Sequence, residues 1–418
     1  MSPTSSREYD LVVLGATGYT GKLCAEYITS SLPTNLKWAV AGRSRTKLLA
    51  IVDELKVSNS DRTQPAIEVA TLSPQDLEKL ARKTRVLINT IGPYYLYSTP
   101  VVETCANNGT HYLDVTGEAP WVLEMIKKYH ETAKANHAII IPEIGIESAP
   151  SDILAFVLTQ LIRKELSVGT KEVVASVHEL KGTPSGGTLA TVFGIVDHYG
   201  LKKTAESSSG KWVSSPVPRP RRDPSPSFIN RLLGVRTVPN LGTMTSSPSA
   251  GPNVATVQRS WGLLDGGQLY GPNFTYHEYL GVRNAAVGIL LHFVFAIGAL
   301  AIALPPLRWV AKKLVYSPGQ GATKEASSKE ALEYRAIATA DQDRPNPRRA
   351  FARFRWDGPL YFFTGVCLAE AAMVLLKEDD LVERLDGGLL TPAMLGQAFV
   401  DRMKAAGMIL DVKMIPDN

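Results

Sequence analysis

The chain has 418 residues, 44% of them hydrophobic and 20% charged, so it is long enough for two domains and can bury a sizeable core. Its net charge of +5 is not concentrated in a dense basic run, which argues against nucleic acid as a partner. The three cysteines are widely spaced and odd in number, so they predict neither a disulfide framework nor a zinc site and fit a reducing, intracellular compartment. The polar N-terminus has no apolar stretch that would predict a secretory signal.

The first 150 residues alternate between short apolar runs and longer amphipathic segments. The apolar runs predict buried strands that end in glycine or polar residues, over 11–16, 36–44, 67–72, 85–93, 111–118 and 138–145. Helical segments join these strands through short linkers. The alternation predicts an α/β fold with a doubly wound parallel sheet, a Rossmann domain, over residues 1–150.

Residues 151–418 predict a second, α+β domain. A helix over 148–166 leads into residues 171–182, whose alternating pattern predicts a strand of a separate sheet. The remaining expected elements are strands over 254–264 and 274–282 and helices over 357–379 and 391–407. Residues 205–252 are rich in serine, proline, glycine and arginine, so we expect a mobile surface loop there.

A hydrophobic segment over residues 284–307 stands apart from the rest of this domain. It contains no charged residue, His292 is its main polar interruption, and three basic residues follow it: Arg308, Lys312 and Lys313. The length suits the hydrocarbon core of a membrane, and the basic cluster suits an anionic surface. The Pro305–Pro306 break favours shallow or re-entrant insertion over a clean span. A buried core helix or hairpin is the alternative.

Three glycines, Gly15, Gly18 and Gly21, occupy the turn between the first strand and its helix. This G-x-x-G-x-x-G spacing differs by one residue from the dinucleotide-binding fingerprint, and the physical roles are similar. The glycines permit a tight turn, a close approach of backbone to a pyrophosphate and close helix packing. The helix N-terminus then offers N–H groups and a positive dipole end to phosphates. Hydroxyl groups are available from Thr17, Tyr19 and Thr20.

The end of the second strand indicates which nucleotide is bound. A site for NAD places an acidic residue there, bonded to the ribose hydroxyls, and this sequence has none. It has Arg43 and Arg45 on either side of Ser44. An arginine can grip a phosphate with two parallel hydrogen bonds, so Arg43 and Ser44 predict NADP rather than NAD. The alternative is a solvated basic loop.

The fourth strand ends in a polar and aromatic segment, residues 88–100. Ligands of doubly wound sheets lie beyond the carboxyl ends of the strands, so Asn89, Thr90 and Gly92 are expected to face the ribose or nicotinamide. Tyr94 or Tyr95 can stack on the nicotinamide or donate a proton, and these two tyrosines are the candidate catalytic residues. The alternative is that the aromatic residues pack a domain interface.

Acidic and small polar residues follow the fifth and sixth strands. They are Asp114, Thr116 and Glu118 after the fifth strand, and Glu143, Glu147, Ser148 and Asp152 after the sixth. They are expected to orient a substrate, although helix capping by Ser148 or Ser151 explains part of the pattern equally well. Ser185 and Thr188 of the glycine-rich stretch 182–191 are further candidates to line the cleft. No motif for a metal site or a hydrolase is found.

Together these motifs resemble those of the saccharopine dehydrogenase-like oxidoreductases, including the bacterial trans-acting enoyl reductases. The resemblance rests on GATGYTG, AGRS, INTIGPY, YLDVTGE, SAPSD, SGGT, VQRSWGLL, YSPGQG and GGLLTPAMLGQAFVDRMKAAG, from Gly15 to about Gly407. It implies an NADP-type Rossmann domain and a second α+β domain. It also implies a hydrophobic segment that is linked in animal members to lipid droplets or membranes. One departure is "GIESAPSD", where Glu147 replaces the family's usual aspartate.

We therefore expect an NADPH-dependent oxidoreductase that acts in lipid metabolism at a membrane or lipid-droplet surface. Its substrate would be a small molecule, or an apolar enoyl or carbonyl group linked to a lipid or carrier. Saccharopine is not expected, because the sequence lacks the set of basic residues that a dicarboxylate amino acid requires. The rival hypothesis is a non-catalytic, nucleotide-binding scaffold anchored at the same surface. A homodimer is compatible with either hypothesis.

Overall fold

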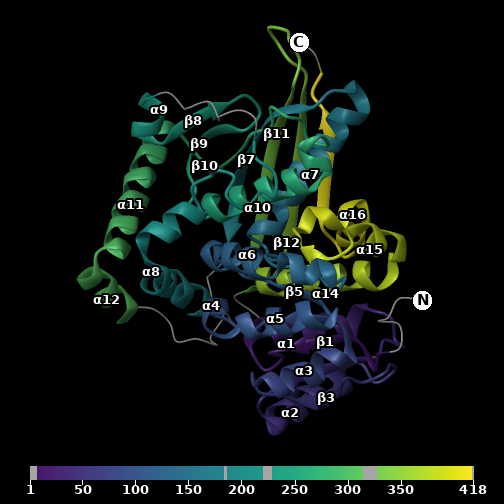
Figure 1. The fold of residues 1–418 in the computed structure, drawn as a ribbon. Coiled ribbons are helices and arrows are strands. Elements are labelled where there is room, and N and C mark those ends of the chain that lie inside the picture. Colours follow the sequence, from purple (N-terminus) through teal and green to yellow (C-terminus); the bar gives the residue numbers. More distant parts are fainter. Residues whose placement is uncertain (1–6, 183–185, 220–227, 314–326, 417–418) are drawn as a thin grey trace.

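The structure, a computed structural model, describes residues 7–182, 186–219, 228–313 and 327–416 (Figure 1). Within these residues the chain forms two seven-stranded sheets. In Figure 1 the residues up to about 145, which form most of the first sheet and its helices, are the lower, purple-to-blue part of the molecule, and the second sheet stands above them.

The first sheet has the order β13-β6-β5-β4-β1-β2-β3, with every neighbouring pair parallel. Its strands are β1 (Tyr9–Leu14), β2 (Trp38–Gly42), β3 (Ala66–Val69), β4 (Thr84–Asn89), β5 (His111–Asp114), β6 (Ile139–Ile141) and β13 (Gly388–Leu389). Apart from β13, this is the Rossmann order, so the predicted parallel sheet is confirmed. Leu11 and Val13 point into one core and Val12 and Leu14 into another, because helices cover both faces.

Helices pack on both faces of the first sheet. One face carries α1 (Tyr19–Ser31), α2 (Arg45–Ser58) and α14 (Leu360–Lys377), and the other carries α3 (Pro74–Lys83), α5 (Thr99–Asn108) and α6 (Ala119–Ala135). Their ends follow the expected capping rules. Ser73 accepts the N–H of Asp76 at the start of α3, and Gly109 ends α5 with a φ of 63°.

The C-terminal part of the chain returns to the first sheet. Helix α14 crosses α1 so closely that a Cβ added to Gly365 would lie 2.8 Å from the Cα of Cys24. Strand β13 pairs with β6 at the edge of the sheet. A division of the chain at residue 150 therefore describes β1–β6 but omits this late contribution, which joins segments more than 200 residues apart.

The second sheet has the order β14-β12-β11-β7-β10-β9-β8, in which β7 and β10 are parallel and the other pairs antiparallel. Its strands are β7 (Thr170–Lys181), β8 (Val235–Val238), β9 (Gly242–Ser246), β10 (Tyr276–Val282), β11 (Ala331–Ala340), β12 (Arg349–Asp357) and β14 (Ile409–Met414). Helices α7 (Ser148–Leu166) and α10 (Ala250–Leu263) pack against it. The other helices are α4 (Tyr94–Tyr97), α8 (Gly186–Ser207), α9 (Phe228–Leu233), α11 (Ala285–Ala303), α12 (Pro305–Lys313), α15 (Asp379–Leu385), α16 (Gly396–Ala405) and the short 3₁₀ helices η1 (Asp265–Gly267) and η2 (Pro392–Leu395).

Two expectations for this part of the chain are wrong. Residues 254–264, predicted as a strand, lie mostly in helix α10, which is buried around Val257 and Trp261. Residues 205–252, predicted as a mobile loop, include α9 and the β8–β9 hairpin, although residues 220–227 lie outside the described part of the chain. The hairpin is ordered because Leu241 and Met244 bury their side chains in a small apolar cluster.

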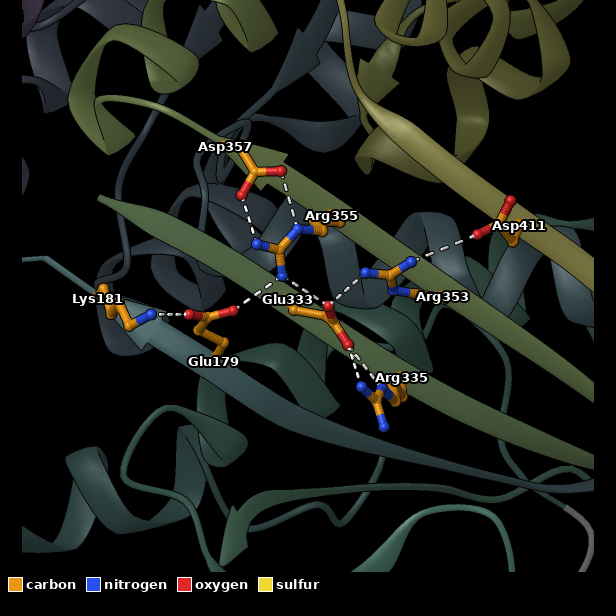
Figure 2. A network of polar contacts seen from close by, with 8 residues as sticks. All are labelled: Glu179, Lys181, Glu333, Arg335, Arg353, Arg355, Asp357 and Asp411. Atoms are coloured by element: carbon orange, nitrogen blue, oxygen red, sulfur yellow. Dashed lines mark hydrogen bonds and ion pairs between the residues drawn. The ribbon is translucent and has the colours of Figure 1, made fainter. Parts of the chain in front are cut away.

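The opposite face of the second sheet carries an ion network, which Figure 2 shows along β7, β11, β12 and β14. At its centre, Glu333 accepts hydrogen bonds from Arg335 at 2.6 Å, Arg353 at 2.9 Å and Arg355 at 2.8 Å. Burial opposes the charge of Glu333, but the three arginines outweigh burial and lower its pKa to about 2. The network ties neighbouring strands together.

Candidate active site

A cleft of about 1040 Å³ runs along the carboxyl ends of the first sheet. Its floor is formed by the residues that directly follow strands β1 to β6. Its roof comes from three other places: the end of β7, the helix α8, and the start of α14 with the segment before β11. The cleft therefore lies between the two sheets, where ligands of doubly wound folds bind.

Most of the predicted site residues line this cleft: Gly15, Thr17, Gly18, Tyr19, Thr20, Arg43, Thr90, Gly92, Tyr94, Thr116, Glu118, Glu147 and Ser148. Gly21, Ser44, Asn89, Tyr95, Asp114, Glu143 and Asp152 are not among its lining residues. Ser185 lies outside the described residues, as does the side chain of Thr188. The roof residues Leu180, Ile195, Glu330, Leu360, Tyr361 and Thr364 were not predicted, because no motif links them to the glycine turn.

The glycine turn forms an open cradle at the N-terminus of α1. Gly15 has a φ of +88°, which favours glycine, and its carbonyl accepts the N–H of Gly18 at 2.9 Å. Gly21 lies beneath the turn, where an added Cβ would be 2.4 Å from the carbonyl oxygen of Gly15. The first turn of α1 has no acidic residue, and Gly18 provides no side-chain cap. These features fit a pyrophosphate held by backbone N–H groups.

The end of β2 brings a positively charged side chain to the part of the cleft next to the glycine turn. Arg43 is exposed and lines the cleft, whereas Arg45 is exposed outside it. Ser44 accepts the N–H of Lys47 at 3.4 Å as the N-cap of α2, and its hydroxyl hydrogen remains a donor. The position of Arg43, one strand away from the glycine turn, fits the 2′-phosphate of NADP.

The two candidate catalytic tyrosines lie in the short helix α4. The backbone N–H groups of Tyr94 and Tyr95 donate to the carboxylate of Glu118, at 2.8 and 2.7 Å. The hydroxyl of Tyr94 donates to the carbonyl of Asn89 at 3.3 Å, and burial raises the pKa of Tyr94 well above its ordinary value. The ring of Tyr95 faces α8, where it packs against His198. Proton donation by either tyrosine stays a prediction, and these contacts give it no support.

Buried carboxyl groups surround the β5–β6 end of the cleft. Asp114 accepts hydrogen bonds from the hydroxyl of Tyr112 at 2.7 Å and from the N–H of Thr116 at 3.0 Å. Burial raises the pKa of several of these groups: Asp114 to about 7, Glu118 to about 7, Asp152 to about 7 and Glu143 to about 8. These acids are therefore partly protonated near neutral pH.

The raised pKa values predict that stability falls as the pH rises from 7 to 8.5. The unfolded chain has already ionised its carboxyls near pH 4 to 4.5, so the native state holds the extra protons and loses them in this window. We expect the free energy of unfolding to fall on the order of 1 to 2 kcal/mol. Because Glu143 titrates highest, Glu143→Gln should remove about half of the fall. Urea unfolding at both pH values would measure it, and a rise in stability would contradict it.

Comparison with known proteins agrees with this geometry. The family model of the saccharopine dehydrogenase NADP-binding domain matches residues 11–141. A trans-acting enoyl reductase of Mycobacterium tuberculosis is 30% identical over 98% of this chain and 99% of its own length. The chain belongs to the saccharopine dehydrogenase-like oxidoreductase family. A trans-acting enoyl reductase of Mycobacterium ulcerans is 29% identical over 97% of this chain and 98% of its own length.

The fold of this family member also resembles a solved structure. Saccharopine dehydrogenase (L-Glu forming) from Saccharomyces cerevisiae aligns with a TM-score of 0.53 over 98% of this chain and 100% of that chain, at 11% identity. This likeness concerns the fold alone. Membership of the family confirms that the chain is an NAD(P)-dependent oxidoreductase, and the matched domain confirms NADP(H) as its cofactor.

Proposed function

We propose that this family member reduces a neutral, largely apolar enoyl or carbonyl substrate, free or linked to a lipid or carrier, at an intracellular membrane or lipid-droplet surface. The observation that carries the substrate class is the lining of the cleft. Among its described lining residues Arg43 is the only basic one, and it lies at the β2 end. The rest of the lining includes apolar side chains, among them Ile146 after β6, Ile195 of α8 and Leu360 of α14, together with acids. A substrate with two carboxylates would meet no cation there.

The residues of the cleft have separate tasks in this proposal. The glycine turn and Arg43 hold the phosphates of NADPH, which supplies a hydride when bound. Glu118 fixes α4 through two backbone N–H groups and so keeps the β4 turn in one position. The apolar roof excludes water and accepts an acyl chain. The mycobacterial relatives are named enoyl reductases, and this supports an enoyl group as the part of the substrate that is reduced.

NADPH oxidation with a defined panel would test this function. The panel pairs the trans-2-hexadecenoyl thioester of N-acetylcysteamine and trans-2-hexadecenal with saccharopine, assayed with NADP in the reverse direction. We expect turnover with one of the first two and none with saccharopine. Turnover with saccharopine alone would overturn the substrate class. Tight NADPH binding without turnover on any substrate would favour the scaffold.

Helix α11 supports the choice of a lipid surface. Among the described residues it is one of two helices long and apolar enough to cross a membrane. Unlike α14, which is mostly buried, α11 has Gly288 as its one buried residue, and this favours a lipid contact over a core helix. One side is held by the protein: Thr245 donates to the carbonyl of Gly288 at 2.8 Å, and His292 bonds to Ser246 at 2.9 Å. At the start of α12, Arg308 forms an ion pair of 2.7 Å with Asp197 of α8.

The outer side of α11 forms a stripe of large apolar residues: Leu290, Phe293, Val294, Ile297, Leu300 and Leu304. Leu290 is 64% exposed and Ile297 is 67% exposed. Trp309 of α12, which is 60% exposed, is a residue type enriched at the membrane interface. Because the inner side of the helix lies on the protein, the stripe favours shallow insertion parallel to the surface over a span.

The triple variant L290E/I297E/L300E is expected to lose binding to phosphatidylcholine–phosphatidylserine vesicles by about 100-fold or more, because three charges would enter the apolar layer. Vesicle flotation measures the bound fraction. The control V57E places a charge at an apolar residue of α2 that is 87% exposed, and it should bind like the wild type. Unchanged flotation of the triple variant would contradict a lipid partner. An oligomer that dissociates in the triple variant without lipid would identify a second copy of the chain as the partner.

A further inference from the structure

Glu147 brings a carboxyl group to the substrate end of the cleft. It follows β6 and immediately precedes α7. Its Oε2 would lie 3.4 Å from a Cβ added to Gly117, so the carboxyl group lies over the end of β5. Strand β4 separates β5 from β1 and β2, which carry the glycine turn and Arg43 at their ends. The Glu147 carboxyl group therefore lies on the far side of the cleft from these nucleotide-binding residues.

The carboxyl group of Glu147 differs from the other acids of the cleft in having no internal partner. Both oxygens of Glu118 accept backbone N–H groups of α4, and Glu330 accepts the N–H of Leu360 at 2.8 Å. Within the described residues, the Glu147 carboxyl group forms no hydrogen bond or ion pair; only its backbone carbonyl does, with the hydroxyls of Tyr334 and Ser151. The side chain is therefore available to a ligand.

The surroundings of Glu147 favour its protonated form. The Glu147 side chain is exposed and lines the cleft. The protein around the cleft wall still removes part of the water from this carboxyl group, and this desolvation raises the pKa of Glu147 above its ordinary value. The cleft presents no lysine or arginine at this end that would stabilise the carboxylate, among the residues described.

We propose that Glu147 is the proton donor of the reduction, an inference that rests on the proposed function. With an enoyl substrate, one carbon of the C=C bond gains the hydride supplied by NADPH, and the π electrons move to the other carbon. That carbon forms a C–H bond with the proton of Glu147, whose O–H bond breaks. The substrate is reduced, NADPH becomes NADP⁺, and the carboxylate regains a proton from water in the cleft. With a carbonyl substrate the oxygen takes the proton.

The first test measures the proton itself and needs no substrate. Infrared spectra of the wild type and of Glu147→Gln, recorded without cofactor across pH 5 to 9, should differ by one protonated-carboxyl band. A control substitution, Glu383→Gln on the exposed face of α15, should leave the spectrum unchanged in that range. If the wild type and Glu147→Gln show the same protonated-carboxyl signal at pH 6 to 7, Glu147 holds no proton there and the proposal is overturned.

The second test uses NADPH binding and turnover of the trans-2-hexadecenoyl thioester. Glu147→Gln should bind NADPH like the wild type but lose kcat by about 100-fold or more, which is the usual contribution of a general acid. Glu147→Asp keeps a carboxyl group at this position and should recover part of the rate. It also takes the place of the glutamine variant if that variant fails to fold. A glutamine variant within threefold of the wild type would overturn the proposal. So would a larger loss in Tyr97→Phe, since Tyr97 also lines the cleft and carries a hydroxyl group. A wild type without turnover on any substrate defeats the proposed function, while the infrared result still decides the protonation of Glu147.

Discussion

Replacing Arg43 with alanine is expected to weaken NADPH binding by about 10- to 150-fold, the effect of removing a hydrogen-bonded charge worth about 1.5–3 kcal/mol. The affinity for NADH should stay unchanged, because NADH lacks the 2′-phosphate. Arg43 is exposed at the cleft wall and follows β2, and no acidic residue stands at this position to bind ribose hydroxyls. Fluorescence titration of the apo-protein with each nucleotide measures both affinities.

The neighbouring arginine provides the control for this prediction. Arg45 is equally exposed and two residues away, but it does not line the cleft, so Arg45→Ala should bind NADPH like the wild type. Both variants lose one positive charge, so a general electrostatic effect would weaken them equally. Equal losses for NADPH and NADH in Arg43→Ala would show that Arg43 does not read the 2′-phosphate.

The floor of the site was predictable from the sequence because its signals are local. Each strand of the first sheet is a continuous apolar run, and polar or glycine residues follow it directly. The parallel order brings these strand ends to one edge, so motifs far apart in sequence meet without further information. Gly15, Arg43, Thr90, Glu118 and Glu147 all line the cleft for this reason.

The roof and the direction of single side chains were not predictable in this way. Tyr361 contacts Tyr19 with ring centroids 5.2 Å apart, a contact that spans more than 340 residues and has no sequence signature. Tyr94 and Tyr95 are adjacent, but α4 turns them about 100° apart, so only Tyr94 reaches the cleft. Residues 254–264 resemble a strand because they begin with the β-branched residues Val254, Thr256 and Val257, whereas tertiary packing makes them part of helix α10.

Replacing Gly21 with alanine is expected to lower the free energy of unfolding by about 2 to 4 kcal/mol. The added Cβ would lie 2.4 Å from the oxygen of Gly15, 2.6 Å from Oγ1 of Thr90 and 2.9 Å from the Cα of Ala16. Two of these atoms belong to the backbone of the turn, which cannot move without shifting α1 away from β1. The displaced helix end would also lose its alignment with the phosphates, so NADPH affinity should fall more than tenfold.

Two other glycines separate the loss of stability from the loss of binding. Gly18→Ala meets only the oxygen of Gly15, at 3.3 Å, and its φ of −82° suits alanine, so stability should change by less than about 1 kcal/mol. Because Gly18 lines the cleft, its new methyl group should still weaken NADPH binding. Gly298 of α11 has no atom within 4 Å of an added Cβ, so Gly298→Ala should be neutral or slightly stabilising. Urea unfolding and NADPH titration of the three variants would test this order, and a Gly21→Ala protein as stable as Gly18→Ala would show that the turn can relax around the methyl group.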